Sequence, residues 1–212
     1  MDKKKNISMA VIKRMPKYHR YLSELLNNEV DRISSKELSE KIGFTASQIR
    51  QDLNCFGDFG QQGYGYNVKE LYTQIGNILG LTREYKTVII GAGNLGQAIA
   101  NYSAFEKKGF TLKAIFDINP KLIGMKIRDI EIIDIDMLDS YLNTNNIDIG
   151  VICVPKKNAQ KVCDILVMSD IKGIWNFAPV DLNVPKDVTV ENVHLSESLL
   201  TLTYLLNNRD DI

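Results

Sequence analysis

The chain has 212 residues, enough for one large domain or two modest ones, and its 44% hydrophobic and 25% charged residues are ordinary for a folded globular protein. No apolar run is as long as the roughly 18 residues that a membrane-spanning helix needs, and no apolar stretch follows the basic N-terminus as in a signal peptide. The three cysteines have neither disulfide-framework nor zinc-site spacing, so we expect a cytoplasmic protein without a metal site.

Positive charge is concentrated at the beginning of the chain, although the formal net charge is zero. Residues 1–20 contain seven lysines and arginines against a single acidic residue. Such a segment suits an arm or face that contacts nucleic acid. On charge alone, a solvated terminus is the simpler interpretation.

The first elements of the chain are predicted to be helices. Apolar side chains recur at helical spacing from residue 12 to residue 26, which indicates a first helix. Ser34 and Glu37 have the spacing of a capping box, so a second helix is expected to begin there and to end at Gly43, a usual left-handed terminator.

A third helix and a ribbon are expected to follow. Residues 45–48 repeat the capping-box pattern, and Ile49 and Leu53 would lie on the buried face of the helix that they open. The glycines and aromatic residues of 56–68 suit a two-stranded ribbon with a tight turn.

Two short helices followed by a glycine-rich ribbon fit a winged helix-turn-helix, in which the second helix enters the major groove of DNA. Arginine can pair with guanine and glutamine with adenine through two hydrogen bonds, which makes Arg50 and Gln51 candidate base readers. A plain helical bundle with solvated charges is the alternative. The candidate DNA-binding residues are Ser47, Arg50, Gln51, Asn54, Lys17, Arg20, Gln62 and Tyr64.

From residue 86 onward, short apolar runs of strand type alternate with helical patterns. This alternation predicts a parallel sheet covered by helices on both faces, and hence an α/β fold for this half of the chain. An apolar helix is expected over residues 196–207. The expected strands are residues 87–90, 112–116, 147–154 and 173–177.

A glycine motif, Gly91-Ala92-Gly93-Asn94-Leu95-Gly96, follows the first of these strands and opens a helix expected to reach about Lys107. Its three glycines suit a tight turn, close approach of the backbone to a pyrophosphate, and close helix–strand packing. Asp117 ends the next strand, where a carboxylate can hold the adenosine ribose and would oppose a 2′-phosphate. The motif therefore predicts a Rossmann-type site for NAD or NADH, although Asp117 could also be a simple turn residue.

A catalytic role for this site is not expected. A dehydrogenase needs a proton-relay group, but the chain contains only two histidines, and no tyrosine is followed four residues later by lysine. Nothing after the Rossmann unit is long enough for a substrate domain, so the nucleotide is interpreted as a signal. A small NAD-dependent oxidoreductase and a CoA- or nucleotide-binding module remain the alternatives.

Taken together, these motifs resemble those of the Rex family of redox-sensing repressors over nearly the whole chain. The resemblance is carried by residues 48–53, 56–57, 60–66, 91–96, 101–102, 154–155 and 176–180. It implies a winged-helix DNA-binding domain at 1–82, a Rossmann NAD(H)-binding domain at 83–194 and a C-terminal dimerisation helix at 195–212 that is swapped between subunits.

The same resemblance implies a function. A homodimer would bind a palindromic operator in the apo or NAD⁺ state and release it on binding NADH, with genes of fermentation and respiration as targets. Without the resemblance, residues 196–207 would be interpreted simply as a core helix. The cofactor-binding residues expected from the motif and the resemblance are Gly91, Ala92, Gly93, Asn94, Leu95, Gly96, Asp117, Tyr102, Val154, Pro155, Asn176, Phe177 and Ala178.

Three positions depart from the family pattern. Gln51 stands where many members have lysine and Gln62 where the wing usually carries arginine, so operator preference is expected to differ at A·T positions. His194 stands where relatives have an aspartate that exchanges partners between residues matching Tyr102 and Arg20. His194 is therefore either a switch residue or a passive loop histidine.

Overall fold

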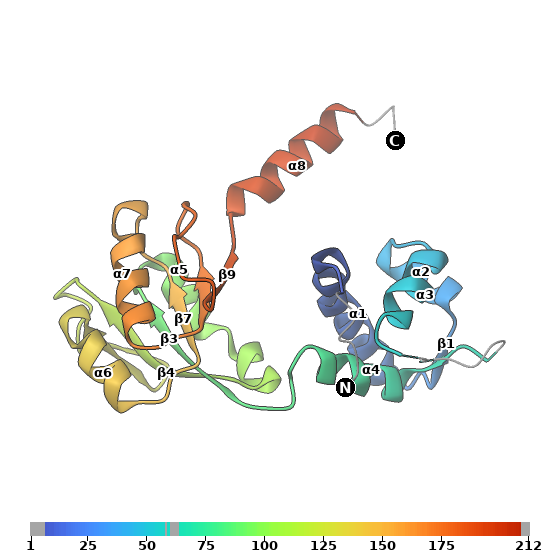
Figure 1. Ribbon diagram of the computed structural model, residues 1–212, viewed down its shortest axis with the longest axis horizontal. Coiled ribbons are helices and arrows are strands. Elements are labelled where there is room, and N and C mark those ends of the chain that lie inside the picture. The colour runs from blue at the N-terminus through green and yellow to red at the C-terminus, as the bar shows by residue number, and fades with distance from the viewer. Residues whose placement is uncertain (1–6, 58, 60–63, 209–212) are drawn as a thin grey trace. The chain divides into compact units, whose positions relative to one another are not determined.

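A computed structural model describes residues 7–57, 59 and 64–208 of the chain, which divides into two compact units, Met1–Arg83 and Glu84–Ile212 (Figure 1). Each unit has its own hydrophobic core. The first unit contains α1 (Met9–Asn27), β1 (Arg32–Ile33), α2 (Ser35–Ile42), α3 (Ala46–Asn54), β2 (Tyr66–Asn67) and α4 (Val68–Ile78).

The helices of the first unit begin where the sequence offers side-chain caps. Ser34 and Glu37 form the expected capping box at α2, and Gly43 ends that helix in the left-handed conformation. Thr45 accepts a hydrogen bond from the Gln48 amide and so caps α3. The buried core of this unit draws on all four helices and both strands: Val11, Met15, Tyr18, Leu22, Leu25, Ile33, Leu38, Ile42, Ile49, Leu53, Tyr66, Val68, Leu71 and Ile75.

The pairing of the ribbon differs from the sequence prediction. Strand β2 pairs antiparallel with β1, a segment between the first two helices that the sequence analysis left unassigned. The reason is close backbone packing: a Cβ on Gly65, which has a φ of 69°, would lie 2.7 Å from the Ile33 carbonyl oxygen. Residues 60–63 of the expected ribbon lie outside the described residues.

The second unit is an α/β domain. It contains β3 (Tyr85–Ile90), α5 (Asn94–Asn101), the 3-10 helix η1 (Ser103–Lys108), β4 (Phe110–Asp117), β5 (Lys126–Ile127), β6 (Ile130–Asp134), the 3-10 helix η2 (Ile135–Met137), α6 (Leu138–Thr144), β7 (Ile149–Ile152), α7 (Lys156–Met168), β8 (Gly173–Asn176), β9 (Thr189–Asn192) and α8 (Leu195–Asn207).

The strands of this unit form one sheet in the order β5-β6-β4-β3-β7-β8-β9, in which only the β5–β6 pair is antiparallel. Counted from β3, the parallel part has the 3-2-1-4-5-6 order of the doubly wound dinucleotide-binding fold. The order reverses between β3 and β7. In such sheets ligands bind outside the carboxyl ends of the strands at this point.

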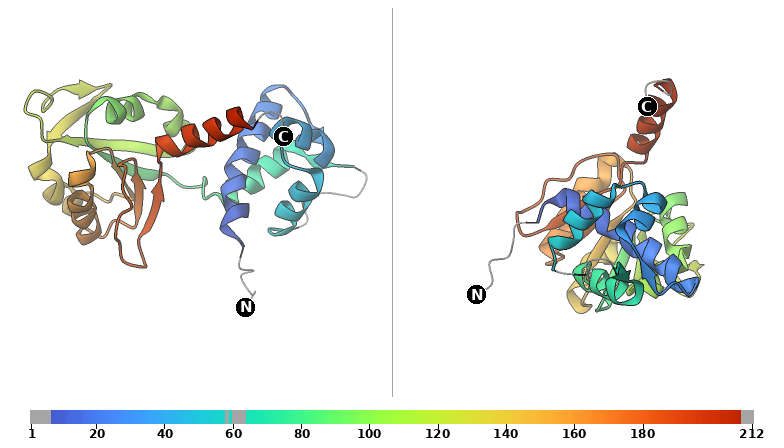
Figure 2. Two further views of the ribbon diagram at one scale, coloured as in Figure 1. Left: turned by 90° about the horizontal axis from the view of Figure 1, so that it is seen from above. Right: turned by 90° about the vertical axis from the view of Figure 1, so that its right-hand side faces the viewer.

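Side chains of the central strands alternate between two cores, as expected for a sheet covered on both faces. Val88 and Ile90 belong to the core that α6 and α7 complete, whereas Ile89 belongs to the core on the side of α5. The left view of Figure 2 shows α5 and α7 on opposite sides of the strands. The expected buried parallel sheet is thus confirmed.

Two expectations about the helices need comment. The helix after the glycine motif was expected to reach Lys107 but ends at Asn101, because Tyr102 leaves the helical region with a ψ of 86°. The chain then forms η1, whose Phe105 packs edge-on against Trp175. The C-terminal helix is present as α8, and none of its residues is buried.

No helix in the described part of the chain is both long enough and apolar enough to cross a membrane.

Candidate functional site

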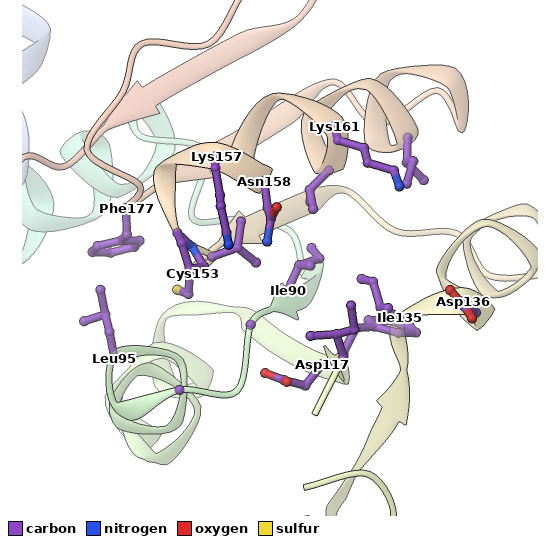
Figure 3. A pocket seen from close by; sticks show the side chains of 18 of the residues that line it. Ile90, Leu95, Asp117, Ile135, Asp136, Cys153, Lys157, Asn158, Lys161 and Phe177 are labelled. Carbon is purple, nitrogen blue, oxygen red and sulfur yellow. The ribbon is translucent and has the colours of Figure 1, made fainter. Parts of the chain in front are cut away.

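A pocket with a volume of about 900 Å³ lies in the second unit at the carboxyl ends of β3 and β7, where the strand order reverses (Figure 3). It is lined by Ile90, Gly91, Gly93, Asn94, Leu95, Phe116, Asp117, Ile118, Ile135, Asp136, Asp139, Cys153, Val154, Pro155, Lys157, Asn158, Lys161, Val162, Ile165 and Phe177. The glycine motif, Asp117 and the Val154-Pro155 pair therefore border one cavity.

The glycine motif has the backbone that the sequence predicts. Gly91 has a φ of 103°, and a Cβ there would lie 2.6 Å from the Cys153 carbonyl oxygen. A Cβ on Gly96 would overlap the Gly91 carbonyl oxygen, so this glycine permits close contact between the loop and α5. Gly93 has no atom within 4 Å of where its Cβ would be, which leaves the backbone open toward the pocket.

Asp117 is held in place by the motif itself. Its Oδ2 accepts a hydrogen bond of 2.6 Å from the Ala92 amide, and its Oδ1 accepts one of 2.7 Å from the Asn119 amide. The carboxylate thus fixes the loop and also ends its own strand with a turn. Because each carboxylate oxygen can accept a second hydrogen bond, the group is still able to bind ribose hydroxyls.

The opposite wall of the pocket comes from α7, which the sequence analysis did not include. Lys157, Asn158 and Lys161 line the pocket with polar groups, and Val162 and Ile165 line it with apolar ones. Their spacing places them on one face of a helix that starts directly after Pro155. That spacing was the available signal.

Aromatic rings form a row at one end of the pocket. Phe177 lines the pocket and packs against Trp175 with 4.6 Å between ring centroids, and Trp175 packs against Phe105 at 5.5 Å. Tyr102 is 58% exposed, lies 4.8 Å from Phe105, and does not line the pocket.

Several residues that were expected to contact the cofactor do not line the pocket. Asn176 is fully buried and donates to the carbonyl of Val180 and to the Asn192 side chain, while its own oxygen accepts from Ala178. Ala92 and Ala178 are also buried, and neither they nor Gly96 and Asn176 line the pocket. Their direct contact with a cofactor stays a prediction.

Cys153 lines the pocket, and the pKa of its thiol differs from the usual value. Burial raises the pKa of the Cys153 thiol to about 12, so it stays protonated at neutral pH. A protonated, half-buried thiol is a poor nucleophile, and it behaves as an apolar lining group.

In the first unit, the predicted reading face of α3 is exposed. Ser47, Arg50, Gln51 and Asn54 are all exposed, whereas Ile49 and Leu53 are buried, as the sequence predicts. The Arg50 guanidinium donates a hydrogen bond of 2.9 Å to the Ser35 hydroxyl at the start of α2. The side chains that would enter a DNA groove thus lie on one surface of this unit.

The buried face of α3 carries a charge that the sequence analysis missed. Asp52 is 1% exposed and forms a bidentate pair with Arg14 of α1, at 2.6 and 2.7 Å. Its carboxylate also accepts hydrogen bonds from Tyr18 and Gln48. Burial raises the pKa of Asp52, but these hydrogen bonds and the Arg14 charge outweigh burial and hold the pKa below its usual range.

The other predicted DNA contacts lie around this helix or at the ribbon. The Lys17 ammonium lies 4.8 Å from the centre of the Phe44 ring, in the turn before α3. Arg20 is exposed and lies over the Tyr21 ring. Tyr64 is 70% exposed, and Gln62 lies outside the described residues.

His194 precedes α8 and contacts the same unit. Its Nε2 lies 3.6 Å from Asp181 Oδ1, which also accepts a hydrogen bond from Asn192. This local contact is consistent with either expected role of His194.

A winged helix-turn-helix unit joined to a Rossmann-type unit defines a class of DNA-binding proteins with a nucleotide-binding domain. Residues 6–54 match a family model described as the putative DNA-binding protein N-terminus, and residues 82–180 match one described as the CoA binding domain. The chain belongs to the Rex family of redox-sensing transcriptional repressors.

Membership rests on relatives that match along the whole chain. The chain is 75% identical over 211 residues to the redox-sensing transcriptional repressor Rex of Clostridium tetani, covering 100% of both sequences. It is 77% identical over 210 residues to the Rex of Clostridium botulinum, covering 99% of this chain and 100% of that one.

Solved structures of a Rex-family repressor are also similar to this chain. The chain resembles the crystal structure of RSP in complex with β-NAD⁺ and operator DNA at 64% identity and a TM-score of 0.91, over 97% of this chain and 95% of that one. It resembles RSP in complex with β-NADH at 61% identity and a TM-score of 0.90, over 97% of both chains. RSP is described as a Rex-family repressor.

Proposed function

We propose that the protein is a redox-sensing transcriptional repressor that binds palindromic operator DNA in its apo or NAD⁺ state and is released when NADH binds. The observation that carries the proposal is the pocket at the strand-order reversal, which joins the glycine motif to Asp117 in a chain with a helix-turn-helix. RSP, at 61–64% identity, has been solved with β-NAD⁺ and operator DNA and with β-NADH.

The residues of the pocket fit a dinucleotide. The open backbone at Gly93 and the start of α5 suit the phosphates, because unpaired amides and the helix dipole favour negative charge there. Asp117 suits the adenosine ribose. Leu95, Val154 and Phe177 give an apolar surface for the nicotinamide ring.

This apolar surface supplies a physical basis for redox sensing. The nicotinamide ring is cationic in NAD⁺ and neutral in NADH. Removing a cation from water is costly, so an apolar enclosure around Phe177 favours the reduced form.

We further propose a homodimer in which α3 of each subunit reads one half-site. Arg50 and Gln51 would contact bases, and Lys17 and Arg20 would contact phosphates. Two-fold symmetric proteins match palindromic sites whose halves lie one or two helical turns apart. NADH would favour a dimer that no longer matches this spacing, so operator DNA must weaken NADH binding by the same factor.

The test is a gel shift with a palindromic duplex of the RSP operator sequence. The protein alone and with NAD⁺ is expected to retain the duplex, and increasing NADH is expected to release it. Equal retention with saturating NADH and without nucleotide would refute the proposal. If CoA competes with NADH in the same titration, the CoA-binding alternative is favoured instead. This alternative is included because residues 82–180 match the CoA binding domain model.

A further inference from the structure

The first turn of α7 faces the glycine motif across the pocket. Figure 3 shows the Lys157 and Asn158 side chains extending from this turn into the pocket, with their nitrogen atoms directed toward the strand ends at Ile90 and Cys153. Both residues line the same cavity as Gly91, Gly93, Asn94 and Leu95 of the motif. Neither was among the residues expected to contact a cofactor.

Both side chains are available for a ligand. Within residues 7–57, 59 and 64–208, no hydrogen bond or ion pair engages the Lys157 ammonium or the Asn158 side-chain amide. The Asp117 carboxylate, in contrast, already accepts two backbone hydrogen bonds. A ligand that fills the pocket would remove water from Lys157, which is favourable only if the ligand brings negative charge.

The position of Lys157 indicates which part of a dinucleotide it faces. In Figure 3, Lys157 lies between Phe177 and Leu95 at one end of the pocket and Lys161 and Asp136 at the other. The apolar end suits a nicotinamide ring, and Asp117 suits the adenosine ribose. The pyrophosphate joins these two groups and therefore passes the middle of the pocket.

The other charged groups of the pocket do not change this assignment. Asp117 is fixed by the loop, and Asp136 and Lys161 lie at the end away from Phe177. Asp139 is also a lining residue and is near the hydroxyl of Ser169, at 3.5 Å. Both α5 and α7 begin without a side-chain cap, so their first amides add to the attraction for an anion.

We propose that Lys157, together with Asn158, is a pyrophosphate-binding residue that completes the phosphate site from the side opposite the glycine motif. This inference rests on the proposed function. NAD⁺ and NADH carry the same pyrophosphate, so Lys157 strengthens the binding of both to the same degree. It sets the total nucleotide concentration at which the sensor responds, and the preference for NADH comes from the apolar end of the pocket.

The test is calorimetric titration of the full chain with NADH, NAD⁺, ADP-ribose and adenosine. Lys157→Gln is expected to weaken the first three about tenfold, equivalent to about 1.4 kcal/mol. Adenosine, which has no phosphate, should lose little. Lys157→Arg should restore most of the affinity because it keeps the charge.

Lys156→Gln is the matched control, since Lys156 is the neighbouring exposed lysine and does not line the pocket. It should bind all four ligands like the unchanged protein. The NADH affinity of the unchanged protein should also fall more steeply with salt than that of Lys157→Gln.

The outcomes separate this inference from the proposed function. If the unchanged protein binds NADH but Lys157→Gln binds it equally well, the role of Lys157 is refuted and the sensor proposal stands. If Lys157→Gln weakens NADH but leaves ADP-ribose unaffected, Lys157 acts on the nicotinamide end and the inference is also refuted. If the unchanged protein binds neither NADH nor ADP-ribose, both proposals fail.

Discussion

Asp117 has a structural role that also suits the ribose-binding role proposed for it. One oxygen holds the Ala92 amide in the glycine motif, and the other holds the Asn119 amide in the turn after β4. These two bonds fix the direction of the carboxylate before any ligand arrives. A fixed acceptor loses less conformational entropy on binding than a mobile one.

Asp117→Ala is therefore expected to weaken the binding of NADH and of NAD⁺ about tenfold each. The variant loses one or two hydrogen bonds to a charged acceptor, each worth about 1.5–3 kcal/mol, and water replaces part of this loss. Removal of the negative charge should also raise the affinity for NADPH relative to NADH. Titrations with all three nucleotides measure both effects. General damage to the loop would weaken the three nucleotides together, so an unchanged NADPH/NADH ratio would contradict the role of Asp117.

The glycine motif allows a sharper comparison between two of its glycines, Gly93 and Gly96. Gly93→Ala places a methyl group in open space at a φ of −69°, which any residue adopts, so thermal stability should not fall. The methyl group should nevertheless obstruct a pyrophosphate and weaken NADH at least tenfold. Gly96→Ala instead overlaps the Gly91 carbonyl oxygen and should lower the melting temperature by several degrees.

Thermal unfolding and NADH titration of both variants check this prediction. Only Gly96→Ala should lower the melting temperature, whereas both variants should bind NADH more weakly than the unchanged protein. If Gly93→Ala binds NADH normally, the backbone at this position is not a phosphate contact.

At the scale of elements, the hydrogen bonds of buried Asp52 hold α3 to the rest of its unit. Arg14 and Tyr18 come from α1, and both bind the carboxylate of Asp52 on α3. A buried charge is expensive unless it is paired, so these contacts restrict how α3 can lie against α1. The position of the exposed face with Arg50 and Gln51 depends on this restriction.

The hydrogen bonds of Asp52 predict how the stability of the first unit varies with pH. The pKa of Asp52 is below its usual range in the folded protein, compared with about 3.9 in an unfolded chain. The folded state therefore favours the ionised carboxylate. Its contribution is complete above about pH 4 and is lost as the pH falls further toward the folded pKa.

Asp52→Asn should remove this pH dependence and should destabilise the unit by roughly 1.5–3 kcal/mol near neutral pH, because hydrogen bonds from Arg14, Tyr18 and Gln48 to a charged carboxylate are replaced by weaker ones to a neutral amide. Denaturant unfolding from pH 2 to pH 7, compared with the exposed-residue control Asp31→Asn, measures the change. A variant with the same acid profile as the unchanged protein would show that Asp52 does not control it.

The elements also show what could be predicted from the sequence and why. Local signals identified the caps at Ser34 and Thr45, and they identified Gly91–Gly96 after a strand. The pairing of Arg32–Ile33 with Tyr66–Asn67 was missed, because two-residue strands have no periodicity of their own. Asp52 was missed for a related reason: only the folded arrangement brings Arg14 beside it.

One wall of the pocket could be predicted from the sequence, and the opposite wall could not. The wall formed by the glycine motif consists of consecutive residues, so a local sequence pattern predicts it. The wall that contains Lys157 forms because α7 lies across the end of the sheet, and this placement depends on the strand order. A sequence reader could note the spacing of Lys157 and Lys161 on a helix. Nothing in that spacing states that the helix faces the glycine motif.

At the scale of the whole molecule, α8 is the element that the chain alone does not explain. All its large apolar side chains are exposed, including Leu202 at 49% and Leu206 at 46%. Burial of one leucine is worth about 1.5–3 kcal/mol, so a helix with several exposed leucines gains considerably from a protein partner. In the proposed dimer that partner is a second copy of the chain.

Leu202 and Leu206 are four residues apart and hence on one face of α8. Their combined replacement, Leu202→Ser with Leu206→Ser, should convert the dimer to monomer at micromolar concentration, since it removes about 3–6 kcal/mol of burial. Light scattering after gel filtration measures the mass. Glu197→Gln, a polar change in the first turn of the same helix, is the control and should stay dimeric.

Loss of the dimer should in turn weaken operator binding more than any single contact does. A dimer engages the second half-site at the high effective concentration created by the first, commonly worth a factor of 10²–10⁴. The double variant should therefore bind a full palindrome only about as well as a single half-site, whereas the Glu197→Gln control should prefer the palindrome strongly. Equal preference in both proteins would mean that α8 does not join the DNA-reading subunits.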